Sequence, residues 1–289
     1  MRTSAIIRII TWSIVAIFLI AILVNVINGN KLFGINIGIS GYSYDDSDKY
    51  LVANGVVNVN DIKNVDINWI SGKIKVIEYD GDNIEFYEEG SSSLDEDNKM
   101  RYLVEDGNLK IKFKNLRKFI SLSLFNPFNK TLVVKIPTTY NNEFNNFTIE
   151  TVSSSVEIEN LNAKNISIEV VSGGVDIENI KSEVLKVETV SGSASISGNV
   201  DFVDSEGVSG KITLDLENCP KEIKAETVSG SINIFIPENE GFTAEYDTVS
   251  GKFKCDFEVT MSKKEAIHKN GKADFELETV SGGININRK

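Results

Sequence analysis

Apolar and polar residues alternate along much of the chain from residue 50 onward, which is the pattern of strands that bury one face. In residues 190–196, Val190, Gly192, Ala194 and Ile196 share one face and three serines share the other. Turn-forming residues separate such runs. The runs are rich in Ile, Val, Thr and Asn rather than in Ala, Leu and Glu, and this composition favours β-sheet over helix. We therefore predict an all-β fold.

The stretch ETVSGSINI at residues 226–234 recurs with small changes through the second half of the chain. Aligned on the valine that precedes Ser, the units begin at Val152, Val171, Val190, Val208, Val228, Val249 and Val280. Their spacings are 19, 19, 18, 20, 21 and 31 residues. A period near 20 is typical of solenoids, in which one coil cannot bury its apolar face without a neighbour. The sequence predicts a β-solenoid of stacked coils of about 20 residues.

The alternation changes phase at the same place in every unit, as at Glu188 and Thr189. We predict a corner there, so that each coil holds two short strands and equivalent strands stack about 4.8 Å apart. The glycine of V-S-G is expected to face inward, where its missing Cβ lets the opposite wall approach. Asp-Gly pairs further predict hairpin turns at residues 80–83 and 106–108.

Residues 9–27 are uncharged and almost entirely apolar, which is long enough for one transmembrane helix. Arg2 and Arg8 precede them without an acidic residue, so the positive-inside rule places the N-terminus in the cytoplasm. A cleaved signal peptide is the alternative, but the apolar run exceeds the usual h-region and no small-x-small site follows. We expect a single-pass protein of the cell membrane with its C-terminal domain extracytoplasmic.

The predicted organisation has four parts. Residues 1–29 form the cytoplasmic tip and signal anchor, 30–49 a juxtamembrane spacer, 50–145 a β-rich part, and 146–289 the repeat solenoid. Residues 258–274 interrupt the last repeat and bring four lysines into an acidic chain. We predict that this insertion is a capping hairpin that protects the end of the solenoid from edge-to-edge pairing; contact with an anionic wall or membrane is the alternative.

The chain carries a formal net charge of −12, and its first 29 residues hold two arginines and no acid, which leaves −14 for residues 30–289. An acidic exterior argues against nucleic acid as a partner and suits cations or cationic partners. The one histidine, His268, lies among lysines and is predicted to be a solvated loop residue. Because no catalytic or nucleotide-binding motif occurs, we do not expect an enzyme and expect no cofactor, calcium being the one candidate ion.

The units T-V-S-G-x-φ-x-φ, the segment LVVKIP at 132–137 and the closing TVSGGINI at 279–286 resemble the bacterial putative-adhesin domain of unknown function, a β-strand-repeat family of the cell envelope. The resemblance covers roughly residues 50–289. It implies a solenoid or rack-like fold and an envelope-associated, membrane-anchored or secreted protein, in some members linked to envelope stress. It implies no catalytic residues. The long spacing before the last unit departs from the regular repeat.

Two columns of repeated side chains are the candidate sites. The acidic column is Glu150, Glu169, Glu188, Glu206, Glu226, Asp247 and Glu278, which would bind calcium, other cations or a cationic peptide if it is more than a solvated edge. The serine column is Ser153, Ser172, Ser191, Ser209, Ser229, Ser250 and Ser281. It is a candidate face for adhesion to an envelope polymer or protein, or else a means of close packing.

The function expected from these observations is that of a non-catalytic, membrane-anchored extracytoplasmic scaffold, adhesin-like or related to envelope stress. One alternative is a sensor that binds cations or cationic peptides along the acidic column. The other is a polysaccharide-active β-helix enzyme, which mixed acidic and basic residues in one groove would favour.

Overall fold

The computed structural model describes residues 47–52, 54–90, 94–114, 129–140 and 143–289. The predicted transmembrane segment, residues 9–27, and most of the spacer lie outside these ranges. Within them, no helix has the length and apolar character needed to span a bilayer.

Strands make up almost all of the regular structure. The N-terminal half contains β1 (Leu51–Val52), β2 (Gly55–Asn58), β3 (Asn64–Tyr79), β4 (Asn83–Glu89), β5 (Arg101–Glu105), β6 (Asn108–Lys112), β7 (Lys130–Pro137) and β8 (Phe144–Glu159). The remainder contains β9 (Ala163–Ser172), β10 (Val175–Ser191), β11 (Ala194–Ser209), β12 (Ile212–Leu216), β13 (Glu222–Ser229), β14 (Ile232–Ile236), β15 (Gly241–Thr248), β16 (Phe253–Cys255), β17 (Thr260–Ser262), β18 (Glu265–Lys269), β19 (Ala273–Ser281) and β20 (Ile284–Arg288). Short 3-10 helices are η2 (Ser47–Lys49), η3 (Val59–Asp61) and η4 (Glu96–Asn98).

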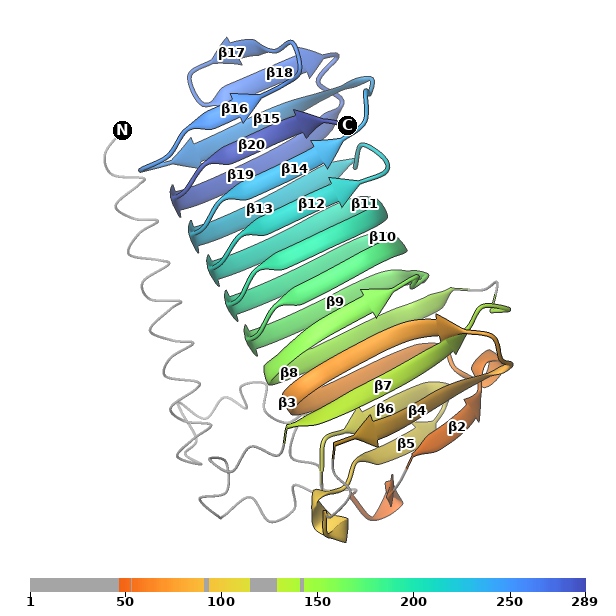
Figure 1. Ribbon diagram of the computed structural model, residues 1–289. Coiled ribbons are helices and arrows are strands. Elements are labelled where there is room, and N and C mark those ends of the chain that lie inside the picture. Colours follow the sequence, from red (N-terminus) through yellow and green to blue (C-terminus); the bar gives the residue numbers. More distant parts are fainter. Residues whose placement is uncertain (1–46, 53, 91–93, 115–128, 141–142) are drawn as a thin grey trace.

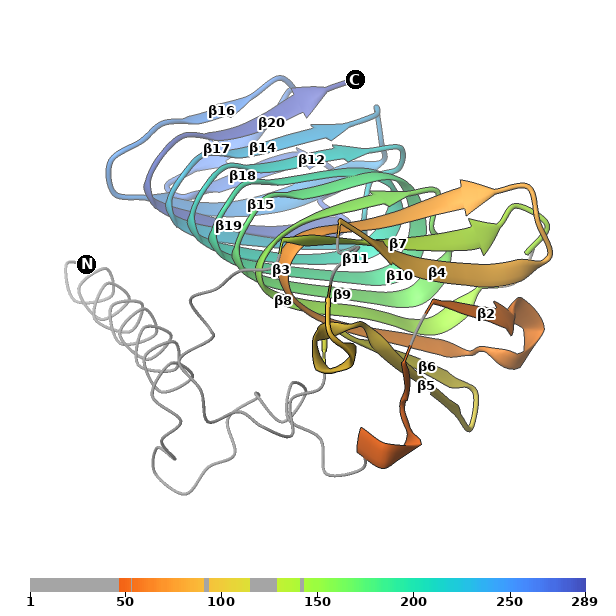
Figure 2. The ribbon, with the colours of Figure 1, turned by 60° about the horizontal axis from the view of Figure 1, so that its bottom comes forward.

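Each coil consists of two strand segments that face each other across the core. In one coil, Leu185 and Val187 point inward from the first layer, and Ala194 and Ile196 point inward from the second; all four are at most 2% exposed. The chain bends from one layer to the other along one edge of the stack (Figure 2). The structure is therefore the all-β solenoid that the repeat predicts.

Neighbouring coils pair in parallel and in register. In β10, Glu188 lies opposite Glu169 of β9 on one side and Glu206 of β11 on the other. The same register continues through β13, so equivalent motif positions form straight columns along the stack. Figure 1 shows the stacked strands. The stack begins before residue 146, because β3 pairs along its length with β8.

The last coil in the sequence is not the last coil in the stack. Strand β19 pairs with β13 on one side and with β15 on the other, and β20 likewise lies between β14 and β16. Beyond β15, strands β18 and β17 form an antiparallel hairpin on the end of the stack (Figure 1). The long spacing before the final repeat thus contains the residues that lead from β15 to this hairpin and return to β19.

Antiparallel strands close the N-terminal end of the stack. Strand β3 still pairs in parallel with β6 and β7. Antiparallel pairing begins beyond them, where β6 pairs with β5 and β7 pairs with β4, which in turn pairs with β2. The predicted hairpin at 106–108 is confirmed: Asp106 and Gly107 have φ of 53° and 77° between β5 and β6. The predicted hairpin at 80–83 is wrong, because β7 lies between the two strands that this turn connects.

The corner lies later in the motif than predicted. Thr189 is 6% exposed and continues the inward row of Leu185 and Val187, whereas Val190 is half-buried and faces outward. The phase of alternation changes across residues 190–193, so the bend is made by V-S-G and not by Glu-Thr. The prediction failed because Thr and Val are both β-branched, and either suits an inward position.

The motif glycine is required by the neighbouring coil and not by the opposite wall. Gly192 has φ of 156°, and a Cβ on it would lie 1.8 Å from the carbonyl oxygen of Gly173 in the adjacent coil. Gly282 repeats the arrangement, with φ of 159° and the carbonyl oxygen of Gly230 at 1.8 Å from the added Cβ. Any side chain there would push two coils apart at the bend.

Candidate functional site

The seven acidic residues of the motif form one column on the outer face of the first layer, each one residue before the position that Thr189 occupies in its unit. Their order along the stack is Glu150, Glu169, Glu188, Glu206, Glu226, Glu278 and Asp247, so the last two exchange places relative to the sequence. Asn68 precedes Glu150, and its amide donates a hydrogen bond of 3.2 Å to that carboxylate. The column exists, but it lies on a strand face and not at the predicted corner.

Lysines neutralise the middle of the acidic column. The Lys224 ammonium lies 3.2 Å from the Glu206 carboxylate and 3.1 Å from that of Glu226, and Lys186 lies 2.5 Å from Glu188. Burial works to lower the pKa of Lys224, but its hydrogen bonds to Glu226 and Glu206 outweigh burial and raise it. This part of the column is a network of alternating charges, not a row of free carboxylates.

The start of the column is different. Glu150 and Glu169 form no ion pair with any other described residue. Burial, followed by the charge of Glu169, raises the pKa of Glu150; burial and the charge of Glu188 raise that of Glu169. A cationic partner would therefore relieve repulsion at these two residues.

The serine column stands at the bend itself. Ser172, Ser191, Ser209, Ser229, Ser281 and Ser250 are exposed, as is Ser153, and equivalent serines of paired coils lie side by side. Their backbone also binds the stack: the Gly192 amide donates a 3.0 Å hydrogen bond to the carbonyl oxygen of Ser209. Beside the serines runs a column of outward valines, half-buried except for Val249, which is 61% exposed. The bend thus presents parallel apolar and hydroxyl columns, and the acidic column runs beside them on the strand face.

An asparagine ladder lies on the outer face of the same layer. The side-chain amide of Asn64 donates to Asn108 at 2.8 Å, that of Asn146 to Asn64 at 2.8 Å, and that of Asn165 to Asn146 at 3.1 Å. Sequence reasoning missed this ladder, although N-F-T-I-E and N-I-S-I-E repeat an asparagine four residues before the glutamate.

His268 is not a solvated loop residue, as the sequence suggested. It lies in β18, is 3% exposed, and packs against the rings of Phe242 and Phe257. Its Nδ1 lies 2.8 Å from the carbonyl oxygen of Glu258, so Nδ1 carries the proton, and its Nε2 lies 3.5 Å from the Glu238 carboxylate. The histidine helps to bind the terminal hairpin to β15.

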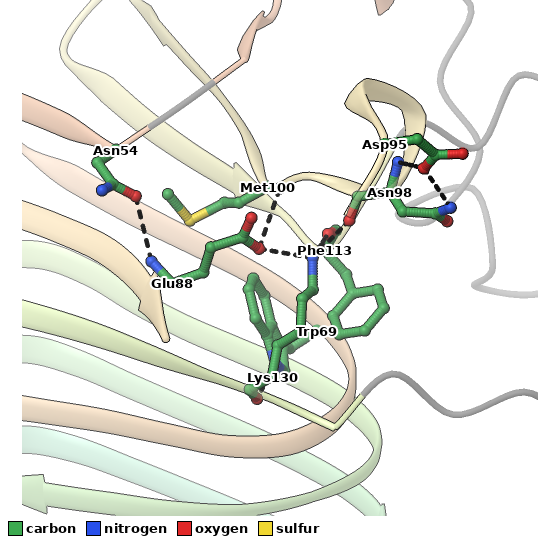
Figure 3. Close-up of polar contacts among 8 residues, drawn as sticks. All are labelled: Asn54, Trp69, Glu88, Asp95, Asn98, Met100, Phe113 and Lys130. Atoms are coloured by element: carbon green, nitrogen blue, oxygen red, sulfur yellow. Dashed lines mark hydrogen bonds and ion pairs between the residues drawn. The ribbon is translucent and has the colours of Figure 1, made fainter. Parts of the chain in front are cut away.

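A buried ion pair at the N-terminal end was also missed. Lys130 is 1% exposed, and its ammonium lies 2.6 Å from the Glu88 carboxylate (Figure 3). It also donates to the carbonyl oxygens of Asn98 and Phe113, at 2.9 and 2.5 Å, and lies 5.1 Å from the centre of the Trp69 ring. Burial lowers the pKa of Lys130 to about 8, against the opposing effect of Glu88. One lysine thus joins β7, β4, β3 and the segment that contains η4.

This cluster fits a structural role. The Glu88 carboxylate also accepts a 3.1 Å hydrogen bond from the Met100 amide, so both charges have several partners. With the amine almost inaccessible and saturated by acceptors, the pair is built to fasten the N-terminal strands to the first coils, and not to react with a ligand.

A hollow of about 430 Å³ lies at the other end of the acidic column. Its lining residues are Glu245, Tyr246, Asp247, Ser262, Lys263, Lys264, Glu265, Glu276 and Glu278. Lys264 is paired with Asp247, and the Tyr246 hydroxyl donates to the carbonyl oxygen of Lys263 at 3.2 Å. Nowhere in the described ranges do three or more carboxylate, thiol or imidazole groups converge as ligands for a metal ion.

The family model of the Toastrack DUF4097 family matches residues 62–287. The chain belongs to this family. The match spans the stack from β3 to β20, so it includes the N-terminal strands from β3 onward as well as the regular repeats. It agrees with the resemblance to a domain of unknown function with an adhesin label.

Solved structures similar to this Toastrack chain include a putative cell adhesion protein from Clostridium sporogenes, with 15% identity over 83% of this chain and 100% of that one, and a TM-score of 0.38. A putative adhesin from Bacteroides fragilis has 15% identity, coverage of 83% and 98%, and a TM-score of 0.47. A putative lipid binding protein from Parabacteroides distasonis has 16% identity, coverage of 82% and 96%, and a TM-score of 0.40. No curated protein matches the chain.

Proposed function

We propose that the protein is a non-catalytic scaffold on the outer side of a cell membrane, which presents the regular columns of its solenoid to an envelope polymer or protein. The observation that carries this proposal is the register of the stack. Identical exposed serines repeat from coil to coil beside outward valines and acids. A surface that repeats every 4.8 Å or so suits a repetitive partner better than a single small molecule.

Membrane anchoring rests on residues 9–27 and on the arginines that precede them. The test is fractionation of cells that express the full chain, with extraction of membranes at alkaline pH. An integral protein stays in the membrane pellet, and protease added to intact cells stripped of their wall removes the C-terminal domain. Release by alkali, or full protection from the protease, would refute the anchor or its orientation.

Adhesion by the serine column is tested by co-sedimentation of the protein with insoluble cell-wall polymer. The variant S191N/S209N enlarges two neighbouring residues of the column. Its matched control, S195N/T213N, enlarges two neighbouring residues on the outer face of the second layer. Loss of sedimentation only in the first variant supports the proposal, whereas equal sedimentation of both variants and the parent contradicts it.

The binding of cations or cationic peptides is the second candidate, supported by the absence of an ion pair at Glu150 and Glu169 among the described residues. Calorimetric titration with calcium and with a lysine-rich peptide distinguishes the two ligands. The variant E150Q/E169Q should lose binding, while E188Q/E206Q, whose carboxylates already have lysine partners, should retain most of it. Saturable binding that both variants share equally would place the site elsewhere.

An enzyme acting on polysaccharides is favoured only by the mixed residues of the hollow beside β15. Because Asp247 and Tyr246 already have partners from the lysine-rich hairpin, the acid and base needed for glycoside cleavage are poorly placed. The test is to incubate the protein with anionic polysaccharides and to measure new reducing ends. Their formation by the parent, and its loss in E276Q/E278Q, would support an enzyme and contradict the scaffold.

A further inference from the structure

The last coil, residues 273–289, occupies a slot between coils that precede it in the sequence. Its strand β19 forms main-chain hydrogen bonds to β13 and β15, and β20 forms them to β14 and β16. All the strand pairing between coil β13/β14 and coil β15/β16 passes through this segment. It is therefore a pair of strands inserted between two coils that precede it in the sequence.

The slot recognises the segment by both backbone and side chains. Phe275, Leu277, Ile284 and Ile286 are at most 1% exposed, and the Phe275 ring stacks on that of Phe242 in β15 at 5.0 Å. The segment ETVSGGINI also differs from ETVSGSINI of β13 and β14 at one position. Its register against that coil is therefore fixed by identical threonine, glycine and isoleucine positions.

A short connection leads from the terminal hairpin into the slot. The chain passes from β18, on the outer edge of β15, to β19, on the inner edge, through residues 270–272. Gly271 has φ of 64° in this connection, and its carbonyl oxygen accepts a 3.1 Å hydrogen bond from Thr243. A short connection between two strands is the kind of hinge that favours exchange between copies.

Exposed ion pairs hold the connection and the chain end in place. Lys269 and Arg288 share the Glu238 carboxylate, the latter at 3.4 Å, and Lys272 lies 3.0 Å from Glu240. Lys289 lies 2.5 Å from Asp215. Because these pairs are solvent-exposed, salt screens them, whereas the hydrophobic and main-chain recognition of the slot is retained.

We propose that the C-terminal coil is exchangeable, and that the slot between β13/β14 and β15/β16 docks residues 273–289 of a second copy of this chain. Reciprocal exchange produces a two-fold dimer in which every strand keeps its partners and only residues 270–272 change conformation. Any contact through residues 9–27 is independent of this exchange.

Cross-linking of the full chain tests the exchange. Lys224 of β13 and Glu276 of β19 are register partners on the outer face, and such neighbours lie within disulfide reach. With Cys219 and Cys255 replaced by Ser, K224C/E276C should cross-link within one copy under oxidation. A mixture of K224C and E276C chains should give a cross-linked heterodimer. While the dimer is minor, its ratio to monomer should rise about tenfold for a tenfold rise in concentration, and it should rise further with salt.

The matched control mixes D204C and K224C chains, since Asp204 and Lys224 are register partners outside the exchanged segment. This mixture should give no heterodimer above background. The proposal is overturned if K224C/E276C cross-links internally while the K224C and E276C mixture never exceeds that control at any concentration or salt.

A labelled peptide of residues 273–289, added to the full chain, gives an independent readout. The peptide should be retained, and its G282V version should not, because a Cβ at residue 282 would meet the Gly230 carbonyl oxygen at 1.8 Å. Equal retention of both peptides, or retention of neither, contradicts docking in the slot.

Discussion

The hydroxyl of Thr279 donates a 3.0 Å hydrogen bond to the backbone carbonyl oxygen of Gly230 in the neighbouring coil. Thr248 makes the same bond to Gly282 at 3.1 Å, and Thr189 bonds to Gly192 of its own coil at 3.3 Å. In these three coils the threonine thus donates to a glycine carbonyl group of the bend, whereas the buried hydroxyl of Thr151, in the coil that has Ser154 in place of glycine, has no such partner. The repeated T-V-S-G has a structural meaning: Thr binds the bend, Val and Ser face outward, and Gly lets the coils touch.

The first prediction concerns this hydrogen bond. Replacement of Thr279 by Val should lower the free energy of unfolding by about 1 kcal/mol, because the Gly230 carbonyl loses its donor. The outward substitution Val280→Thr is the control and should change it by less than about 0.5 kcal/mol. Urea unfolding measures both changes. Equal stability of the Thr279 variant and the parent would show that the hydrogen bond from the hydroxyl does not stabilise the fold.

Two glycines of the chain should respond oppositely to alanine. Gly192→Ala should destabilise the protein by at least about 2 kcal/mol, since the backbone is left-handed and the neighbouring carbonyl is in the way. Gly207 stands where other units have Thr or Val, and a Cβ there would make ordinary contacts, with the hydroxyl oxygens of Thr189 and Thr227 at 3.5 Å and the Cβ of Thr227 at 3.8 Å. Gly207→Ala should therefore stabilise the protein by about 0.4–1 kcal/mol. Thermal unfolding checks the pair, and similar effects of the two changes would contradict the description of the bend.

The Lys130–Glu88 pair predicts a large mutational effect. Lys130→Met should cost about 3–5 kcal/mol, because it leaves the Glu88 carboxylate buried without its cation. The double variant K130M/E88L should recover much of the loss, since both charges then disappear together. If the single and double variants unfold at the same urea concentration, the two residues are not energetically coupled.

Lys130 should also impose a pH dependence. Its pKa is about 8 in the folded protein and 10.5 when unperturbed, so between these values the folded chain holds fewer protons than the unfolded chain. The contribution of this group to the free energy of unfolding therefore rises with pH through this window and is lost as pH falls to about 8. Urea unfolding across the window should show a steeper rise for the parent than for K130M. Parallel curves would show that Lys130 does not titrate there.

The start of the acidic column predicts a pH effect of opposite sign. Because the pKa of Glu150 is raised in the folded protein, its charge destabilises the fold above that pKa, and the penalty disappears as pH falls toward the unperturbed value of 4.5. Glu150→Gln should therefore stabilise the protein at pH 7 and not at about pH 4.5. Glu157→Gln, which removes a carboxylate paired with Lys73, is the control and should not stabilise at either pH. A variant no more stable than the parent at pH 7 would mean that the column is fully solvated.

The stacked coils and their columns were predictable because the motif repeats at a nearly constant period, and identical residues in register must line up. The sequence could not predict which of Thr189 and Val190 faces inward, because both side chains fit a strand interior. The contact that decides it is a hydrogen bond to a backbone carbonyl of the bend. The ion pair between Lys130 and Glu88 could not be predicted from the sequence around either residue, because strands far apart in the sequence bring the two together. The spacing of 31 residues marked the last coil as irregular, but only strand pairing shows on which side of β15 it lies.

The most direct measurement of the central claim, an in-register stack with the last coil inserted, is the distance between spin labels on exposed serines. In the structure, Ser281 lies four coils from Ser172, and Ser250 lies one coil further on. At about 4.8 Å per coil, labels at Ser172 and Ser281 should be about 19 Å apart, and those at Ser172 and Ser250 about 24 Å. The reverse order, with Ser250 the nearer residue, would mean that coils stack in the order of the sequence and would contradict the insertion.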